Sequence, residues 1–492
     1  MPENDQDPVV ENPTYLGNIR YFFEGEDIDH MQQKGIDLGS YAGVKAHAVQ
    51  IYSAVTPPAF MPPNPARQWS ANRCQTFLNW IGNKYPMGTP APTSLGAEAF
   101  AEAPSRIRKN AANLTSDEVQ LLAKAFSGVM AKAVDDQQGY FFIAGLHGLP
   151  GGYCQHHNDP FNPWHRIYLK QFEDALRAIP GCGAVTMPYW DIANPVPAFL
   201  SEPPFAAYTF PQDLGTYKSG TTTTRNTQAQ IDAKLAQFSF MGDYELALSQ
   251  SRWGKFLIDS TTGKVGYGYQ QWSIQAHDSG HMATGLTMSK QNYSSFDPIF
   301  WFYHCNLDRH WLSWQTQLHA LDWTSFQSLL DSTVFWKAPL NSIDPFAITT
   351  EQTIAFGIGY DQLLVPSQPL KETMNKTLAE STFSIADDAM INVAVEGIER
   401  LRIPGSFVVN LLADGERVAS RAFFQPDSPP TCKTCVTIPT VGLQLRVEQS
   451  EIVGKRLTIE LEVPDQADIG ATFPLSQAGE LTVRANLPIE GE

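Results

Sequence analysis

The sequence contains no stretch that approaches the roughly 20 consecutive apolar residues of a membrane-spanning helix. Basic residues are also few, because 34 lysines and arginines stand against 51 aspartates and glutamates, and the formal net charge is −17. This charge repels nucleic acid and anionic membranes, so we expect neither as a partner. The segment MPENDQDPVVENP lacks the basic and apolar parts of a signal peptide. We therefore expect a cytoplasmic protein, although export by another route would leave no such mark.

Cysteine is too rare for a disulfide framework, with six in 492 residues. Cys432 and Cys435 form one C-x-x-C pair in a loop rich in proline. A second pair of ligands does not accompany them, which argues against a zinc site. The pair is either a local disulfide, two free thiols, or a soft-ligand pair suited to loading Cu(I). No C-x-x-C-H is present for covalent attachment of haem.

Histidine is equally uncommon, but eight of the eleven histidines lie in two short stretches. In the second stretch, residues 275–314, His277 and His281 are four residues apart. A helix would therefore turn both imidazoles towards one side. His304 follows on a second apolar helix, which Asp297-Pro298 would start. Three converging imidazoles are a typical ligand set for copper or zinc.

The first stretch, residues 146–170, contains His147, His156, His157 and His165. A helix is predicted to begin at Asn162-Pro163 and to carry His165. Neither stretch has the H-E-x-x-H glutamate that zinc peptidases use as a general base. Two sets of three histidines without a carboxylate ligand favour a redox copper pair over a hydrolytic zinc. The other interpretation of these histidines is a zinc hydrolase or a metal-storage protein.

Several motifs resemble, in the same order, those of the type 3 copper proteins, which include tyrosinases, catechol oxidases and molluscan haemocyanins. CQH at 154–156 and PWHR at 163–166 resemble the first copper site, and MPYWD at 187–191 resembles a PYWDW motif. DPIFWFYHCNLDRHW at 297–311 resembles the second copper site. The resemblance spans roughly residues 105–365. It implies a mainly α catalytic domain, with a four-helix bundle that houses two copper ions, and O2 as co-substrate.

Matched to the family's motifs, the resemblance assigns each copper ion three histidines. They are His147, His156 and His165 for copper A, and His277, His281 and His304 for copper B. Cys154 matches a cysteine that forms a thioether to the second histidine, here His156, or else it is a buried free thiol. Phe300 would stack on a ligand ring or belong to the core, and Asp308 matches a structural residue behind the site.

The chain departs from the family pattern in three places. The family's paired histidines are Tyr303-His304 here. Phenol-hydroxylating members usually hold a water between a glutamate and an asparagine that follows the first copper B histidine. Here Asp278 takes the place of that asparagine, and no glutamate occurs between residues 246 and 350. Asp278 is either a catalytic base beside the site or an aspartate that supports a ligand. We therefore expect a polyphenol oxidase that converts o-diphenols to o-quinones, with hydroxylation of monophenols as a further candidate activity. The alternative is a haemocyanin-like protein that binds O2 without turnover.

The patterns divide the chain into five parts. We expect a disordered tail over 1–13, a small helical module over 14–87, a linker over 88–104, the copper domain over 105–365 and a β-sandwich over 366–492. Within them, Ser70 and a Thr115–Glu118 capping box should begin helices. Alternating apolar residues and an Asp414-Gly415 turn predict antiparallel strands. This last part resembles the domain that shields the active site of latent polyphenol oxidases, with Phe423 or Phe424 as a candidate plug. The physiological phenol and the oligomeric state stay open.

Overall fold

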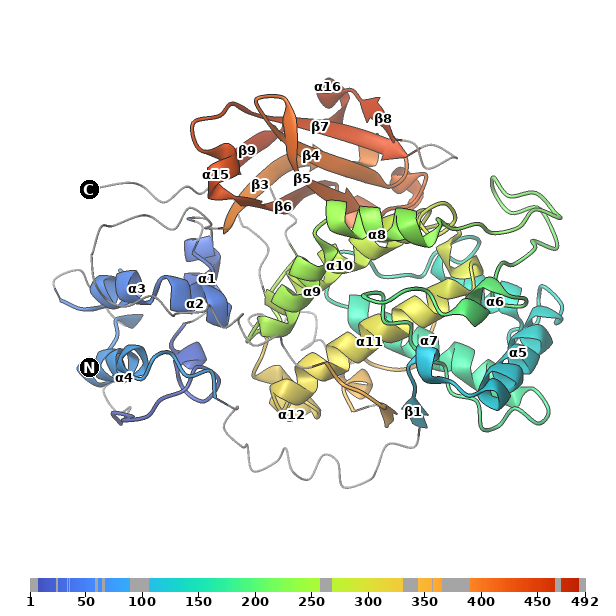
Figure 1. Ribbon diagram of the computed structural model, residues 1–492, viewed down its shortest axis with the longest axis horizontal. Coiled ribbons are helices and arrows are strands. Elements are labelled where there is room, and N and C mark those ends of the chain that lie inside the picture. Colours follow the sequence, from blue (N-terminus) through green and yellow to red (C-terminus); the bar gives the residue numbers. More distant parts are fainter. Residues whose placement is uncertain are drawn as a thin grey trace.

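The computed structural model describes residues 8–23, 25–32, 34, 36–57, 61–63, 67–88, 106–256, 268–330, 344–355, 357–364, 390–464 and 470–485. Within this part of the chain, a group of helices at the N-terminus lies beside a larger helical region. A pair of antiparallel sheets from the C-terminal part packs over the larger region (Figure 1). The fold class predicted from the sequence, mainly α with a C-terminal antiparallel β part, is confirmed. The predicted linker lies outside the described residues except at residue 88.

The N-terminal helices surround an aromatic core. They are α1 (Gly25–Gln32), α2 (Tyr41–Ala46), α3 (Ala48–Val55) and α4 (Ala71–Gly82). Ser70 caps α4 as predicted, because its side chain accepts a hydrogen bond from the Arg73 N–H. Residues 8–13, expected to belong to the disordered tail, instead lie against α4. The Val10 N–H donates to Thr76 Oγ1, and Asn79 donates to the Val10 carbonyl. These contacts satisfy backbone groups of the segment, so the part of that expectation that covers residues 8–13 was wrong.

The central region contains the helices that carry the histidines. They are α5 (Ser116–Met130), α6 (Tyr140–His147), α7 (Phe161–Ala178), α8 (Gln228–Gln237), α9 (Phe240–Ser249), α10 (Gly268–Thr284), α11 (Ile299–Gln317) and α12 (Trp323–Gln327). The predicted capping box of α5 is present, with Thr115 and Glu118 bonded in both directions. Two predicted starts were slightly wrong. Helix α7 begins at Phe161, before Asn162, and α11 begins one residue after Pro298.

Helices α10 and α11 approach each other closely at Gly280. A Cβ atom built on Gly280 would lie 2.1 Å from the hydroxyl oxygen of Tyr303, so only glycine fits there. The same hydroxyl donates to the His277 carbonyl on α10, at 3.0 Å. Tyr303, which stands where the family has a histidine, therefore joins the two helices that carry the second histidine set.

A buried ionic network anchors α7 and α11 to a short parallel pair of strands, β1 (Arg106–Arg108) and β2 (Ile358–Tyr360). Asp308 on α11 accepts hydrogen bonds from Arg166 Nε at 2.5 Å and from Arg108 Nη1 at 3.2 Å. The Tyr360 hydroxyl donates to the same carboxylate at 2.6 Å. Glu173 on α7 is paired with Arg108 from the other side. Asp308 thus balances two buried guanidinium groups that come from different segments.

The C-terminal part is a sandwich of two antiparallel sheets, ordered β6-β3-β9 and β5-β4-β7-β8. Its strands are β3 (Met390–Glu399), β4 (Phe407–Ala413), β5 (Glu416–Phe423), β6 (Thr440–Glu448), β7 (Leu457–Pro464), β8 (Gly470–Phe473) and β9 (Thr482–Ala485). Three short helices accompany them: α14 (Lys433–Thr437), α15 (Gln449–Ile452) and α16 (Leu475–Ala478). Asp414 and Gly415, both with positive φ, connect β4 to β5 as predicted. Strand β5 packs on α10 and brings the sandwich to the histidine-bearing helices.

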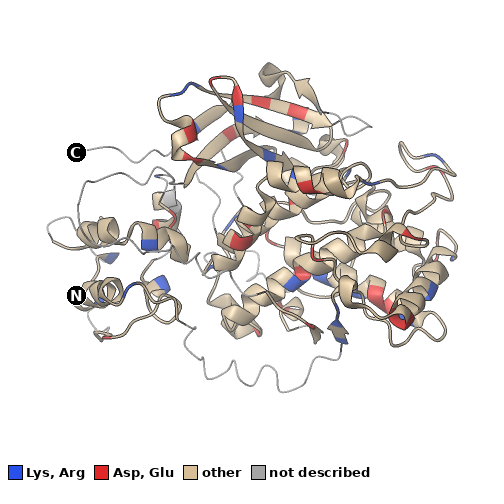
Figure 2. Cartoon of the chain, viewed as in Figure 1, with Lys and Arg blue, Asp and Glu red and all other residues tan. Residues whose placement is uncertain are grey.

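Figure 2 shows charged residues of both signs spread over the helical and sheet parts of the chain. Opposite charges also meet across the parts, because Arg421 of β5 is paired with Asp243 of α9 in the interior. No helix among the described residues is long and apolar enough to cross a membrane.

Replacement of Asp308 should destabilise the protein strongly. An Asp308→Asn variant leaves Arg108 and Arg166 without their shared negative charge, and loss of one partner of a buried ion pair costs about 3–5 kcal/mol. The free energy of unfolding in urea would measure this. Asp174→Asn is the matched control: its carboxylate pairs with Lys170 and Arg106 but is 43% exposed, so we expect a loss of at most about 1 kcal/mol. Equal losses in the two variants would contradict the role assigned to Asp308.

Candidate metal centre

The first set of three histidines comes from two helices and the loop between them. His147 is the last residue of α6, His156 lies in the loop, and His165 is in the second turn of α7. All three are buried, and one ring nitrogen of each lies within 4.8 Å of those of the other two. The structure therefore brings together the three histidines that the sequence analysis assigned to copper A.

The second set lies on two helices. His277 and His281 are one turn apart on α10, and His304 points to them from α11. Their ring nitrogens also lie within 4.8 Å of one another, and the two Nε2 atoms of His281 and His304 are 3.0 Å apart. The three histidines assigned to copper B are thus brought together as well.

The two sets face each other. The rings of His165 and His304 are stacked, with centroids 4.6 Å apart and planes at 15°. His156 and His277, also from different sets, have centroids 5.3 Å apart. Two metal ions held by these sets would therefore be neighbours in one chamber.

The unused ring nitrogens show that this chamber fits two metal ions. Among the described residues, no hydrogen-bond partner exists for Nε2 of His156, His165 and His277, or for either nitrogen of His147. The Nε2 atoms of His281 and His304 contact only each other there. A buried polar atom without a partner is costly, and a metal ion would satisfy one nitrogen of each of these imidazoles.

Hydrogen bonds on the far side of several rings orient them for metal binding. Nδ1 of His165 donates to the Phe161 carbonyl at 2.8 Å, and Nδ1 of His281 donates to the Met288 carbonyl at 2.9 Å. Nδ1 of His277 contacts a carboxylate oxygen of Asp278 at 2.8 Å. These contacts place the proton on Nδ1 and leave Nε2 free to bind a metal.

Burial also keeps the imidazoles neutral. It lowers the pKa of His165 and of His281 to about 3, and it lowers the pKa of the other four well below the usual value. A neutral imidazole is the form that binds a metal. Six neutral nitrogen ligands without a carboxylate ligand suit copper.

Phe300 lies where the resemblance places it. Its ring stacks on His304 with centroids 4.1 Å apart and also meets the edge of His147. Asp308 does not touch a ligand ring directly, but it holds Arg166, the residue after His165. His310 is packed inside, where it bonds to the Tyr244 carbonyl and the Tyr269 hydroxyl, and so lies apart from both sets.

Cys154 is a buried free thiol in the structure. The side-chain amide of Gln291 donates to its sulfur at 3.0 Å and lies 2.9 Å from Nδ1 of His156. One amide therefore holds both residues that the predicted thioether would join, and the thioether itself stays a prediction. The sequence analysis missed Gln291, because it lies in a loop without a recognisable motif.

Asp278 is surrounded by hydrogen-bond donors. Besides His277, its carboxylate contacts Nε2 of His157 at 2.8 Å and accepts a hydrogen bond from the Phe424 N–H at 3.1 Å. Burial raises the pKa of this carboxyl group. Asp278 therefore supports a histidine of the second set, and its role as a catalytic base stays a prediction.

Phe424 of the C-terminal sandwich covers the chamber. It follows β5 directly, and its ring stacks on His281 with centroids 4.1 Å apart and planes at 14°. Its edge also meets His156 and His277. Phe423, the other candidate plug, instead stacks on His157. Of the two, Phe424 therefore contacts the histidines of both sets.

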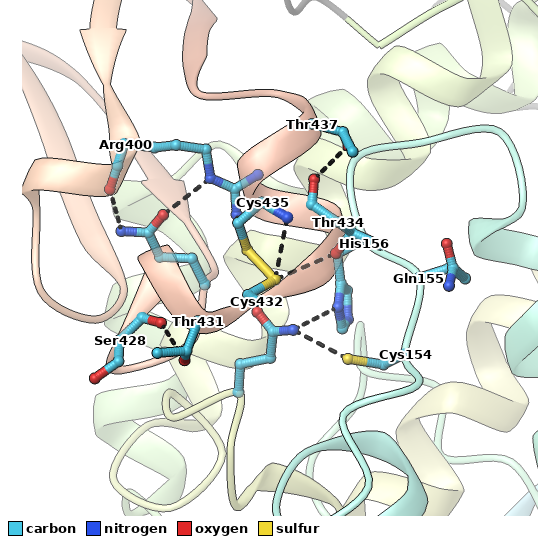
Figure 3. The surroundings of a disulfide bond; sticks show 12 residues. Cys154, Gln155, His156, Arg400, Ser428, Thr431, Cys432, Thr434, Cys435 and Thr437 are labelled. Atoms are coloured by element: carbon cyan, nitrogen blue, oxygen red, sulfur yellow. Dashed lines mark hydrogen bonds between the residues drawn. A yellow bond between two sulfur atoms is a disulfide. The ribbon is translucent and has the colours of Figure 1, made fainter.

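Cys432 and Cys435 form a disulfide (Figure 3). Arg400 donates a hydrogen bond to the sulfur of Cys435 at 3.3 Å, and its guanidinium group lies over the ring of Phe423. In this oxidised state the pair offers no thiolate to Cu(I), so copper loading would require reduction first. The loading role stays a prediction.

The chain is similar to known proteins over its central part. Residues 137–317 match the family model described as the common central domain of tyrosinase. A unit of a haemocyanin from Helix pomatia is 32% identical, over 42% of this chain and 51% of that protein. A tyrosinase from Hahella is 24% identical, over 40% of this chain and 56% of that protein. The chain thus spans about half the length of these curated relatives.

Solved structures of both kinds share the fold. A tyrosinase from Burkholderia thailandensis has a TM-score of 0.56 at 19% identity, over 78% of this chain and all of that chain. A functional unit of octopus haemocyanin has a TM-score of 0.55 at 21% identity, with the same shares covered. The fold therefore does not separate an oxidase from an O2 carrier.

Loss of one histidine should remove one metal ion. We expect His281→Gln to reduce the copper bound after reconstitution from about two ions per chain to about one, because the second set loses a ligand. Elemental analysis after removal of unbound copper measures this directly. His47→Gln, which changes a partly buried histidine bonded to Gln50 and outside both histidine sets, should still bind about two. Two ions bound by His281→Gln would contradict the assignment.

Proposed function

We propose that this chain, which belongs to the type 3 copper proteins through its central domain, oxidises o-diphenols to o-quinones with O2. The observation that carries the proposal is the ring of Phe424, which lies flat on His281 inside the chamber. It supports the proposal because the space beside the second histidine set accepts one aromatic ring. A phenolic substrate would take the same position once this ring leaves.

Copper held by the two histidine sets supplies the redox chemistry, in which two o-diphenols give two o-quinones and one O2 is reduced to two waters. The side chains of the chamber orient the substrate and exclude water from it. The stacked face of His281 and the edges of His156 and His277 would guide a substrate ring. All three imidazoles are buried, so water is excluded around the substrate.

Asp278 favours oxidation of o-diphenols over hydroxylation of monophenols as the main activity. Its carboxylate is already engaged by His157, His277 and the backbone N–H of Phe424. A group with three donors around it is better placed to orient His277 than to accept a proton from a phenol. Hydroxylation with Asp278 as the base stays a separate prediction.

A haemocyanin-like O2 carrier is the second candidate, and the covering of the chamber favours it. Phe424 is fully buried, and its ring occupies the place that a substrate would need. O2 is much smaller than a phenol and could enter a chamber that excludes an aromatic ring. The same covering is equally consistent with a latent oxidase, so removal of the ring is the decisive change.

Phe424→Ala should activate the full-length protein. The substitution removes the ring but keeps the backbone N–H that bonds to Asp278, so the chamber opens while the histidines stay oriented. We expect catechol oxidation, followed by O2 uptake and quinone absorbance, to rise at least about tenfold over wild type.

Phe473→Ala is the matched control, because Phe473 of β8 is a partly buried phenylalanine that packs against the sandwich core. It should leave the rate at the wild-type level. A copper-loaded Phe424→Ala protein that binds O2 reversibly but produces no quinone would contradict the oxidase and support the carrier.

A further inference from the structure

We infer that His157 is a positioning residue for the second metal site, which it supports through Asp278 although its neighbour His156 serves the first. The inference rests on the copper centre of the proposed function and adds a residue to which the sequence analysis gave no role. It follows from a row of three side chains, His157, Asp278 and His277.

The row is continuous and buried. Nε2 of His157 lies 2.8 Å from Oδ2 of Asp278, and Oδ1 of the same carboxylate lies 2.8 Å from Nδ1 of His277. The side chains of His157 and His277 are fully buried, and that of Asp278 is 1% exposed. At its far end the row leaves Nε2 of His277 without a partner among the described residues, directed to the metal chamber. A carboxylate behind a ligand histidine fixes its ring and its tautomer.

The backbone at His157 is adapted to this role. Its φ angle is +57°, a left-handed conformation that is uncommon outside glycine, although histidine adopts it more readily than most residues. This conformation lets His156 and His157 serve different sites. The ring of His156 enters the chamber, while that of His157 turns to Asp278, 121 positions away in the sequence. One loop therefore holds a ligand of the first site and supports a ligand of the second.

The C-terminal sandwich holds the same row in place. Phe423 stacks on the ring of His157 with centroids 4.2 Å apart and planes at 13°, and Phe256 packs nearby at 5.0 Å. The next residue, Phe424, donates its backbone N–H to Oδ2 of Asp278 at 3.1 Å. Docking of the sandwich thus supplies Asp278 with a further donor and clamps His157. The second metal site is held by elements of both domains.

Two substitutions separate the hydrogen bond of His157 from its packing. His157→Phe keeps an aromatic ring between Phe423 and Phe256 but has no donor for Asp278. His157→Gln loses the ring but places an amide N–H near the position of Nε2. Both variants carry the same unfavourable left-handed backbone conformation, so a difference between them reports on the donor.

The experiment measures copper at the second site alone. In a His147→Gln background the first set lacks one of its three ligands. Full-length proteins with the Cys432–Cys435 disulfide intact are titrated with Cu(I) without O2, in competition with a coloured Cu(I) chelator. We expect His157→Phe to weaken binding at the second site by about 10- to 100-fold, whereas His157→Gln stays within about threefold of the parent.

Asp278→Asn is a second variant, which tests the same row of side chains if His157→Phe fails to fold. An amide presents only one accepting oxygen to three donors, so it should also weaken copper at the second site by at least about tenfold. Unchanged affinity in folded His157→Phe, or in Asp278→Asn if that variant alone folds, would overturn the inference. Equal losses in the Phe and Gln variants would overturn it too, because the left-handed backbone that both carry, and not the donor, would then explain the effect. Failure of the wild-type chain to bind copper would overturn the proposed function instead.

Discussion

The rest of the structure depends on six neutral imidazoles buried in one chamber, in four of which Nε2 has no hydrogen-bond partner among the described residues: His147, His156, His165 and His277. Each such nitrogen, if left without a partner, costs about 1–3 kcal/mol. The fold tolerates this only because rigid packing around the chamber prevents the rings from turning to other partners. Metal binding removes the penalty, so the same nitrogens that weaken the metal-free protein would make metal binding favourable.

The rigidity comes from contacts behind the rings. Gly280 allows α10 to reach Tyr303, which bonds to the carbonyl of His277 and holds the helices of the second set together. For the first set, Asp308 holds Arg166 beside His165. These contacts explain why the replacement of the family's first paired histidine by Tyr303 leaves the ligand set complete: the tyrosine joins the helices and never enters the chamber.

The sequence predicted what depends on local spacing. The four-residue step from His277 to His281, the capping box at Thr115 and the turn at Asp414-Gly415 are all set by backbone geometry within a few residues, and each has the expected local structure. The six histidines could be named because spacing and family motifs agree on them. Helix starts near Asn162 and Pro298 were less accurate, because each helix begins at a different residue from its proline signal.

Contacts between distant segments could not be predicted in the same way. His157 meets Asp278 across 121 positions, and Phe424 meets Asp278 across 146. No periodicity or motif links such pairs, so the sequence analysis gave His157 no role and left Asp278 between two roles. It named Phe423 and Phe424 together as candidate plugs. Only tertiary structure separates them, since successive residues at a strand end face different partners.

The residues at the end of β5 block the metal chamber and also support the row of side chains behind His277. Removal of the whole sandwich would change both at once. The Phe424 ring blocks the chamber, whereas its backbone N–H and the ring of Phe423 support the row behind His277. Removal of the sandwich would open the chamber and, at the same time, withdraw one donor from Asp278 and the ring that covers His157. Substrate access to the chamber would then improve, which raises activity. At the same time the ligand His277 would be held less firmly, which lowers activity. Because the blocking group is a side chain and the supporting group next to Asp278 is backbone, a single substitution at Phe424 can change access alone.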